Sequence, residues 1–273
     1  MQRLIFNQIT PNKKQSYLPF ALTDIFAEFV HSNHIEIIHF WQLENTFILG
    51  MKDTRTPFLK KGIKKVLETP YFPIVRNSGG LGVIADEGIL NISYLFPKTA
   101  TVASTDQAYE KMFELTKQAF PELQIEAYEI PDSYCPGTYD LSVNGKKIAG
   151  IAQRRIKEGI AVMMYLSVNG NQLARGELVK SFYHDSLDPQ KPDASYPTIQ
   201  PKSMVNLETL LGYPLSIQDV KKRFEVLLKP TECLNDPLTW VSEQQLEAKF
   251  QQKLASMEKR NQVIQEVRDE LTL

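Results

Sequence analysis

Apolar residues recur at helical spacing in several parts of the chain. They fall three or four positions apart in residues 18–30, and the same pattern returns in residues 109–120, 217–228 and 246–267. This pattern predicts helices, the last of them a long helix that begins near Ser242. We interpret the last two apolar stripes as faces packed on the same core, although a partner-docking face would need the same spacing.

Short apolar runs predict strands elsewhere. Residues 35–40, 46–51 and 71–75 each have the length and composition of a strand, and residues 83–96 fit one or two more. Polar or glycine-containing segments separate these runs, as expected between elements.

The middle of the chain carries its clearest β-hairpin signal. Residues 139–143 alternate in polarity, Asn144 and Gly145 supply a turn, and residues 147–153 return. Asn-Gly favours the turn geometry that matches the twist of paired strands. A second turn precedes a buried run over residues 161–168, so we expect a three-stranded meander.

Together these elements predict an α/β (α+β) fold. We expect mixed or antiparallel sheets with packed helices, followed by a helical tail. The chain of 273 residues suits one large domain with an appendage. We therefore place a main domain in residues 1–215 and a helical C-terminal extension in residues 216–273, packed on the same core.

Composition excludes several classes of function. The 31 basic and 32 acidic residues give a formal net charge of −1, without a dense basic stripe, so we expect no nucleic-acid partner. No stretch approaches the roughly 18 apolar residues that span a bilayer, and the first residues lack a signal-peptide pattern. We therefore expect a cytoplasmic protein without a membrane partner.

The cysteines and histidines argue against a disulfide framework and a metal site. Cys135 and Cys233 are the two cysteines, too few for such a framework. The four histidines form no convincing cluster with a cysteine or a carboxylate. We expect free thiols and no metal.

The first candidate for chemistry is the run Arg76-Asn77-Ser78-Gly79-Gly80. Glycines let a backbone pass close to a ligand, and exposed N–H groups there could hold a carbonyl or phosphate oxygen. A plain turn between strands would also explain the glycine pair. Such a turn does not require Arg76.

The second candidate is Cys135, within the turn-forming segment 133–137. A structural cysteine would normally sit in an apolar run, whereas loop residues on a rigid sheet are favoured sites of catalysis. An inert thiol is the alternative, because a lone cysteine is usually unreactive.

The third candidate is the lysine pair at the start of the returning hairpin strand. Adjacent side chains on a strand point to opposite faces, so Lys146 and Lys147 cannot both face solvent. A lysine beside a thiol would stabilise its thiolate, or would donate to the oxygen of an acyl carbonyl. An ordinary solvated lysine pair remains the other interpretation.

These motifs occur together in one order: RNSGG, then SYCPG, then GKKIAGIAQRR. The set resembles the biotin/lipoate protein ligase and lipoyl/octanoyl transferase superfamily. The stretches LGMKDTRTPFL, VRNSGGL, DEGILNIS and SYCPGTYDLS are similar to its octanoyl-[glycine cleavage H protein]:protein N-octanoyltransferases. The resemblance covers roughly residues 40–215, and its joint motif set is specific although each part alone is not.

The resemblance implies a catalytic domain related to biotin ligases and class II aminoacyl-tRNA synthetases. It implies that Cys135 carries the acyl group as a thioester and that Lys147 assists it, so both are expected to be catalytic. The substrate site is expected to include Arg76, Asn77, Ser78, Gly79, Gly80, Ala149, Gly150 and Ile151. The implied donor is the octanoylated glycine cleavage H protein, the implied acceptors are lipoyl domains of 2-oxoacid dehydrogenase E2 subunits, and no cofactor is expected.

One departure from the superfamily bears on ATP. The ATP-dependent lipoate ligases resemble RRxxGGGxVxHD in this region, where this chain has Leu81 for the third glycine and Ala85 for the histidine. A side chain at Leu81 argues against adenylate formation. Three other hypotheses remain: an ATP-dependent lipoate ligase, an octanoyltransferase that uses acyl carrier protein, and a non-catalytic adaptor for acylated carrier domains.

Overall fold

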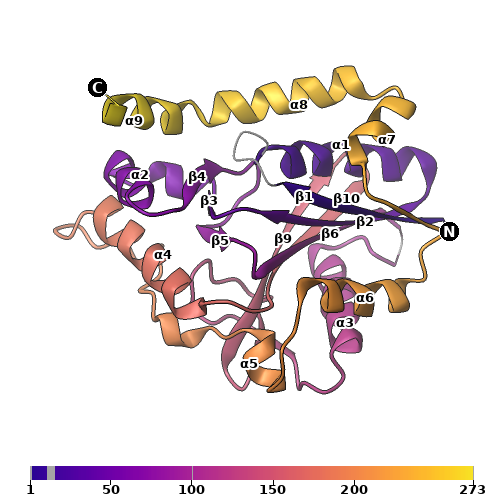
Figure 1. The fold of residues 1–273 in the computed structure, drawn as a ribbon, viewed down its shortest axis with the longest axis horizontal. Coiled ribbons are helices and arrows are strands. Elements are labelled where there is room, and N and C mark those ends of the chain that lie inside the picture. The colour runs from indigo at the N-terminus through magenta and orange to yellow at the C-terminus, as the bar shows by residue number, and fades with distance from the viewer. Residues whose placement is uncertain (1, 11–15, 100, 273) are drawn as a thin grey trace.

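The computed structural model describes residues 2–10, 16–99 and 101–272. A large sheet has the strand order β11-β1-β2-β6-β10-β9-β8-β7, and a small sheet has the order β4-β3-β5 (Figure 1). The large sheet comprises β1 (Arg3–Thr10), β2 (Glu36–Leu43), β6 (Ile89–Pro97), β7 (Glu126–Ala127), β8 (Leu141–Val143), β9 (Lys146–Ile156), β10 (Gly159–Ser167) and β11 (Glu232–Leu234). The small sheet comprises β3 (Thr46–Leu49), β4 (Phe72–Val75) and β5 (Val83–Ala85).

Helices cover both faces of the large sheet (Figure 1). They are α1 (Leu18–Asn33), α2 (Leu59–Leu67), α3 (Thr105–Ala119), α4 (Gln172–Ser186), α5 (Leu207–Leu211), α6 (Ile217–Leu228), α7 (Pro237–Glu243), α8 (Glu247–Arg260) and α9 (Gln262–Thr272). The mixed α/β architecture confirms the predicted fold class.

Three apolar clusters hold the layers together. One joins the large sheet to α3 and α6 through residues such as Phe40, Met112 and Phe224. A second joins the opposite face to α1 and α7, where Phe26 and Trp240 pack. The third lies around the small sheet, α2 and α4. The small sheet is thereby fixed beside the large one, and the candidate site lies where the two meet.

Local sequence signals set several element boundaries. The β8–β9 turn has positive φ at both Asn144 (50°) and Gly145 (73°), and β8, β9 and β10 form the expected antiparallel meander. Ser104 begins α3 with a reciprocal capping box, and Ser216 does the same for α6.

The prediction of one long C-terminal helix from Ser242 is wrong. Ser242 lies inside α7, and the chain turns at Gln245, whose φ of 56° interrupts helical geometry. A second break falls at Asn261, between α8 and α9. Its side-chain amide accepts from the Val75 N–H at 2.6 Å and donates to the Val75 carbonyl at 3.0 Å. The tail is therefore bonded to the end of β4.

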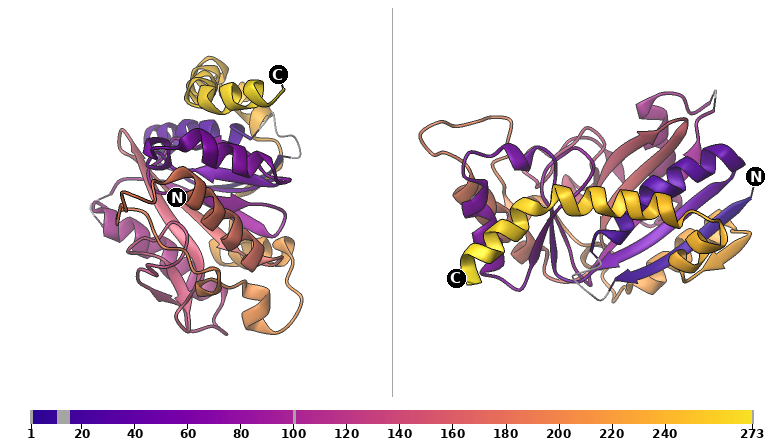
Figure 2. Two further views of the ribbon diagram at one scale, coloured as in Figure 1. Left: turned by 90° about the vertical axis from the view of Figure 1, so that its left-hand side faces the viewer. Right: turned by 90° about the horizontal axis from the view of Figure 1, so that it is seen from above.

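The tail stripe nevertheless packs on the core, as predicted. Phe250, Met257, Ile264 and Val267 are buried. Figure 2 shows α8 and α9 running along one side of the molecule, where α8 contacts α1 and α9 contacts α2. The boundary between residues 1–215 and 216–273 stays a prediction.

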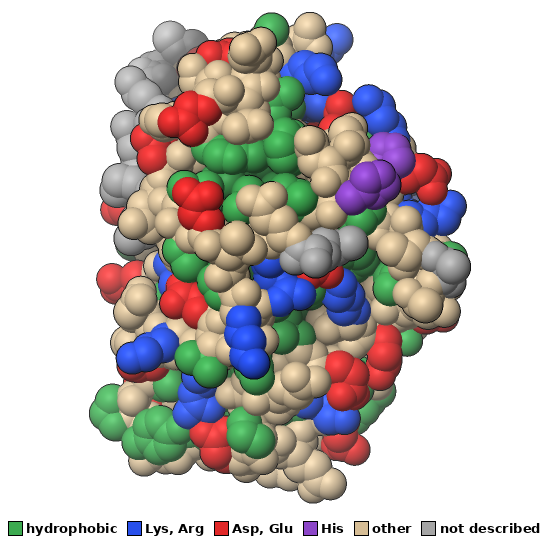
Figure 3. All heavy atoms as spheres, turned by 90° about the vertical axis from the view of Figure 1, so that its right-hand side faces the viewer, with side chains coloured by type: hydrophobic (Ala, Val, Ile, Leu, Met, Phe, Trp, Pro, Cys, Tyr) green, Lys and Arg blue, Asp and Glu red, His purple; other side chains and the backbone are tan. Residues whose placement is uncertain are grey.

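The first strand of the chain pairs with the last strand at one edge of the large sheet. Strands β1 and β11 are parallel and pair Leu4 with Glu232. The N–H of Thr231 donates to the Arg3 carbonyl at 2.8 Å. Figure 3 shows the face on this side of the molecule, where acidic and basic side chains are interspersed among the described atoms. Such a mixture does not form the basic stripe that nucleic-acid binding uses.

A buried histidine under this edge predicts acid sensitivity. His39 is fully buried, its Nε2 lies 2.8 Å from Gln8 Oε1, and burial lowers its pKa to about 3. Between pH 6.5 and 3, His39 is protonated in the unfolded chain and neutral in the folded chain. This histidine therefore lowers the free energy of unfolding as pH falls, by up to about 1.4 kcal/mol per pH unit.

Urea unfolding between pH 7 and 3 measures this effect. Asp53, whose pKa burial raises to about 6, acts in the opposite direction between pH 6 and 3.8. As the pH falls, we therefore expect the free energy of unfolding of His39→Leu to rise relative to that of the wild type. The exposed His184, changed to Gln, is the control and should follow the wild-type profile. Identical profiles for wild type and His39→Leu would contradict the prediction.

Candidate active site

A cavity of about 330 Å³ lies beside Cys135. Its walls come from β2, β6, β9 and β10 of the large sheet, from β3 and β5 of the small sheet, from α1 and from the segment 76–80. Its volume falls in the range of small-molecule sites, and Phe20, Trp41, Ile48 and Val83 make part of the wall apolar. Such a space suits an apolar chain.

Most of the predicted site residues meet at this cavity. Those that line it are Arg76, Ser78, Gly79, Gly80, Cys135, Lys147, Gly150 and Ile151. Ala149 instead packs in the cluster under α3 and α6, because it points to the opposite face of β9 from Gly150. Asn77 is not among the lining residues either.

Asn77 joins the glycine segment to its neighbours. Its side-chain amide donates to the Phe20 carbonyl at 3.3 Å and to Asp24 Oδ1 at 3.2 Å. Its own carbonyl accepts from Arg154, which also pairs with Asp24. Asn77 therefore anchors the segment to α1 through its side chain and to β9 through its carbonyl.

The Cys135 sulfur faces two donors. The Leu81 N–H lies 3.3 Å from Sγ, and Arg76 Nη2 lies 3.8 Å from it. Cys135 itself has a φ of 49°, a left-handed conformation that non-glycine residues rarely adopt. The half-buried sulfur thus has a guanidinium and a backbone N–H directed at it.

Gly80 has to be a glycine at this position. Its φ is 91°, and an added Cβ would lie 2.5 Å from Arg76 Nη2 and 3.3 Å from Cys135 Sγ. Any side chain there would displace the arginine from the sulfur. The arginine is further held by two hydrogen bonds to the Gly79 carbonyl, at 3.2 and 2.7 Å.

The turn at residues 50–53 supports the glycine segment from behind. The N–H of Met51 donates to the Ser78 carbonyl and that of Lys52 to the Gly80 carbonyl, both at 3.4 Å. A Cβ at Gly50 would lie 2.0 Å from the Gly80 carbonyl oxygen, so the two backbones touch. This contact gives a physical reason for the LGMKD stretch.

Asp53 and Tyr183 complete that support. Asp53 accepts from the Gly50 N–H at 2.7 Å and from the Tyr183 hydroxyl at 2.8 Å. The same hydroxyl accepts from the Gly82 N–H at 3.1 Å. Burial, together with Asp53, raises the pKa of Tyr183 well above its ordinary value. Asp53 belongs to the stretch LGMKDTRTPFL, but the sequence offered no signal for its contact with Tyr183, which is 130 positions away.

Lys147 holds the segment that carries the cysteine. Its Nζ contacts the Ser133 hydroxyl at 3.3 Å, the Tyr134 and Cys135 carbonyls at 2.9 and 2.7 Å, and Asp140 Oδ1 at 2.9 Å. Only 1% of the Lys147 side chain is exposed, whereas Lys146 is exposed, so the predicted alternation of the pair is confirmed.

Asp140 is the buried counter-ion of Lys147. Burial raises the pKa of its carboxyl, and Lys147 opposes that rise. Its other oxygen accepts from the N–H groups of Ile130 and Gly137, at 3.2 Å each. The pair thus ties together both ends of the loop around Cys135.

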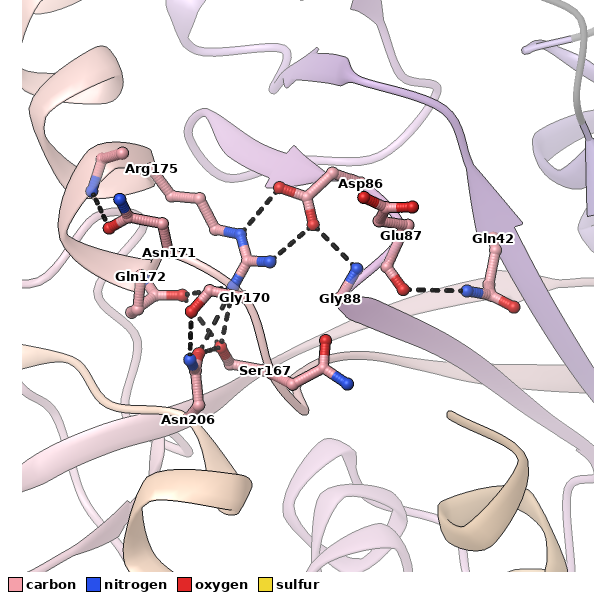
Figure 4. A network of polar contacts seen from close by, with 12 residues as sticks. Gln42, Asp86, Glu87, Gly88, Ser167, Gly170, Asn171, Gln172, Arg175 and Asn206 are labelled. Atoms are coloured by element: carbon pink, nitrogen blue, oxygen red, sulfur yellow. Dashed lines mark hydrogen bonds and ion pairs between the residues drawn. The ribbon is translucent and has the colours of Figure 1, made fainter. Parts of the chain in front are cut away.

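A second polar network lies beneath Tyr134, the residue before the cysteine. The Tyr134 hydroxyl bonds to that of Tyr165 and accepts from Gln172 Nε2 at 3.2 Å. Gln172 in turn accepts from Arg175, which forms a buried, two-bond ion pair with Asp86 at 2.6 and 2.8 Å (Figure 4). The network fixes the floor of the cavity to the turn after β5.

The chain is similar to known proteins of one family. Residues 15–228 match the family described as lipoyl protein ligase A/B catalytic domain. An octanoyl-[GcvH]:protein N-octanoyltransferase of Exiguobacterium is 39% identical over 238 residues, which cover 86% of this chain and 84% of the relative. The relative of that name from Staphylococcus aureus is 44% identical over 205 residues, covering 74% and 73%. The chain belongs to the lipoyl protein ligase A/B catalytic-domain family, with the octanoyl-[GcvH]:protein N-octanoyltransferases.

Family membership makes the protein an acyltransferase. A solved bi-partite lipoate protein ligase of Thermoplasma acidophilum aligns with a TM-score of 0.66 over 97% of each chain, at 16% identity, which supports the shared fold. None of the described helices of this octanoyltransferase family member is long and apolar enough to cross a membrane. Among the described residues, no group of three or more His, Cys, Asp or Glu side chains is placed to hold a metal ion.

Proposed function

We propose that the protein moves an octanoyl or lipoyl group from a lysine of the glycine cleavage H protein to a lysine of lipoyl domains. Such domains are carried by E2 subunits of 2-oxoacid dehydrogenases. The group travels as a thioester on Cys135. The observation that carries this proposal is the position of Cys135 Sγ, at an apolar cavity and facing the Leu81 N–H and Arg76. The names of the relatives supply the donor.

The first half-reaction exchanges a C–N bond for a C–S bond. The Cys135 thiolate attacks the carbonyl carbon of the acyl-lysine amide, and the lysine amine leaves with the proton that the thiol gave up. Negative charge on the carbonyl oxygen is met by donors beside the sulfur, for which Arg76 and the Leu81 N–H are placed. The neutral amine of the acceptor lysine then attacks the thioester carbonyl carbon, the C–S bond breaks, and the proton lost by the amine returns to the Cys135 sulfur as the new amide forms.

Lys147 acts in this scheme as a positioning residue. Its ammonium already contacts three oxygens of the cysteine segment together with Asp140. A lysine so engaged is suited to hold the backbone of Cys135 in its left-handed conformation. Arg76 and the Leu81 N–H then stand as the charge-stabilising groups.

The cavity supplies binding energy for the acyl chain. Burial of an eight-carbon chain, at about 0.8 kcal/mol per CH₂, yields a gross 5–6 kcal/mol. That energy helps to hold the carbonyl beside Cys135. Because one amide replaces another, the net free-energy change is small and no ATP is required.

Intact-mass measurement tests the proposal. Protein incubated with octanoylated H protein and no ATP should gain one octanoyl mass, which neutral hydroxylamine removes. Because a thioester lies above an amide in free energy, we expect this adduct on a small fraction of the protein. Transfer to an apo lipoyl domain should proceed without ATP. Transfer that requires ATP, or that proceeds only from acyl carrier protein, would replace this proposal with a ligase or with the alternative octanoyltransferase.

A further inference from the structure

Asn91 is a buried polar residue on the cavity wall with an unpaired side-chain nitrogen. It is 4% exposed, lies in β6 and lines the cavity. Among the described residues, buried side-chain atoms without a hydrogen-bond partner occur at His39, Asn91, Ser142, Ser186 and Arg260. Of these, Asn91 is the one that lines the cavity. An unpaired buried amide is unusual enough to require an explanation.

The strand register places Asn91 within a row of cavity residues. Trp41, Asn91, Tyr165 and Gly150 stand opposite one another across β2, β6, β10 and β9, and all four line the cavity. Directly opposed residues point to the same face of a sheet. Neighbouring strands lie about 4.8 Å apart, so Asn91 is roughly 10 Å from Gly150.

Cys135 lies at the Gly150 end of this row. A Cβ at Gly150 would be 3.4 Å from Lys147 Nζ, which donates to the Cys135 carbonyl at 2.7 Å. A fully extended chain advances about 1.2 Å per bond, so the seven C–C bonds of an octanoyl group cover about 8 Å. An acyl group held on Cys135 and lying along the row would place its last carbons beside Asn91.

Other polar groups of the row are already bonded. Trp41 Nε1 donates to Ser93 Oγ at 3.1 Å, and the Tyr165 hydroxyl bonds to Tyr134 and Gln172. The Asn91 amide therefore has hydrogen-bonding capacity left, on a residue that lines the distal end of the cavity. Because its nitrogen is itself buried, a rotation of the amide about the last side-chain bond is what presents the N–H to the cavity. The two candidate cargoes differ at that end, because octanoyl carries only hydrogen there and lipoyl carries two ring sulfurs.

We propose that Asn91 is the residue that distinguishes acyl chains by their distal end. The inference rests on the proposed function and concerns which acyl group, octanoyl or lipoyl, the enzyme prefers. Sulfur is a weak hydrogen-bond acceptor, whereas a methyl group accepts nothing. A lipoyl chain thus pairs the Asn91 N–H, and an octanoyl chain leaves it unpaired. Removal of the amide should favour octanoyl over lipoyl.

Titration calorimetry with free octanoic and lipoic acid tests this on the full chain. Asn91→Leu keeps a similar size and removes the amide, and should raise the ratio of octanoate to lipoate affinity about tenfold. Ser186→Ala is the matched control: it removes a buried, unpaired oxygen that does not line the cavity. This control should keep the wild-type ratio. Circular dichroism checks folding, and Asn91→Met replaces Asn91→Leu should the latter not fold.

The two possible failures are distinguishable. An octanoate-to-lipoate ratio that stays within twofold of wild type in Asn91→Leu overturns the role of Asn91, whatever the enzyme does with carrier proteins. Binding of both acids with the expected shift, combined with no transfer from either acylated H protein, upholds the role of Asn91 and overturns the proposed function.

Discussion

Cys135→Ala should lose acyl transfer by about four orders of magnitude or more, because it removes the thiol that holds the acyl chain in the proposed mechanism. Within the described part of the chain, the hydrogen-bond donors to the sulfur are the Leu81 N–H and Arg76, and the segment is held through its backbone. Stability should therefore change little. Transfer from octanoylated H protein to an apo lipoyl domain measures the loss, and thermal unfolding checks the fold.

Two further variants sharpen this experiment. Cys135→Ser should accumulate a hydroxylamine-resistant ester if the serine is acylated at all. Cys233→Ser is the control, because Cys233 is exposed in β11, at the sheet edge, and outside the cavity. It should transfer at the wild-type rate. Substantial transfer by Cys135→Ala would point instead to direct attack by the acceptor lysine, and the thioester mechanism would be lost.

Lys147→Met should reduce the free energy of unfolding by about 3–5 kcal/mol. The substitution leaves the Asp140 carboxylate buried without its counter-ion, which is the costly way to break a buried pair. It also frees the Ser133 hydroxyl and the carbonyls of Tyr134 and Cys135. Urea unfolding measures the loss of stability, and the acyl-transfer rate measures the effect of releasing the cysteine segment.

A double variant separates stability from positioning. Lys147→Met with Asp140→Asn removes both charges and should recover much of the stability, because asparagine keeps an acceptor for the Ile130 and Gly137 N–H groups. If Lys147 positions the cysteine, transfer by the stable double variant should remain at least about 100-fold slow, with kcat affected more than KM. Lys146→Met removes the exposed neighbour and should alter neither property. A double variant that is both stable and fast would show that the pair only stabilises the fold.

Sequence reasoning succeeded where the determining interactions are local. Asn144 and Gly145 set the predicted hairpin turn through their own backbone preference. Alternation along one strand was enough to separate Lys146 from Lys147. Most of the glycine segment and Cys135 were found through their joint resemblance to a family.

Sequence reasoning failed where residues far apart make the contact. Asn77 belongs to the predicted motif, yet its side chain bonds to Asp24 on α1 and not to the cavity. The C-terminal stripe was continuous, but Asn261 bonds to Val75, 186 positions away, at the break between two helices. Asp53 and Asn91 lie in stretches that resemble the family, LGMKDTRTPFL and DEGILNIS, but local pattern gave neither residue a role. The contact of Asp53 with Tyr183 and the place of Asn91 on the cavity wall depend on the tertiary arrangement.

The late closure of the sheet edge has a consequence for synthesis on the ribosome. Arg3 bonds to Thr231, which is 228 positions later in the chain. Strand β1 therefore cannot pair with β11 until most of the chain has emerged from the ribosome. Asn261, which bonds to the end of the strand leading into Arg76, emerges later still. At typical elongation rates, the Cys135 codon is translated on the order of 10 s before that residue is made. During that interval Val75, the residue before Arg76, lacks its bonds to Asn261, so we expect a nascent chain to take up an acyl group poorly until its tail has docked.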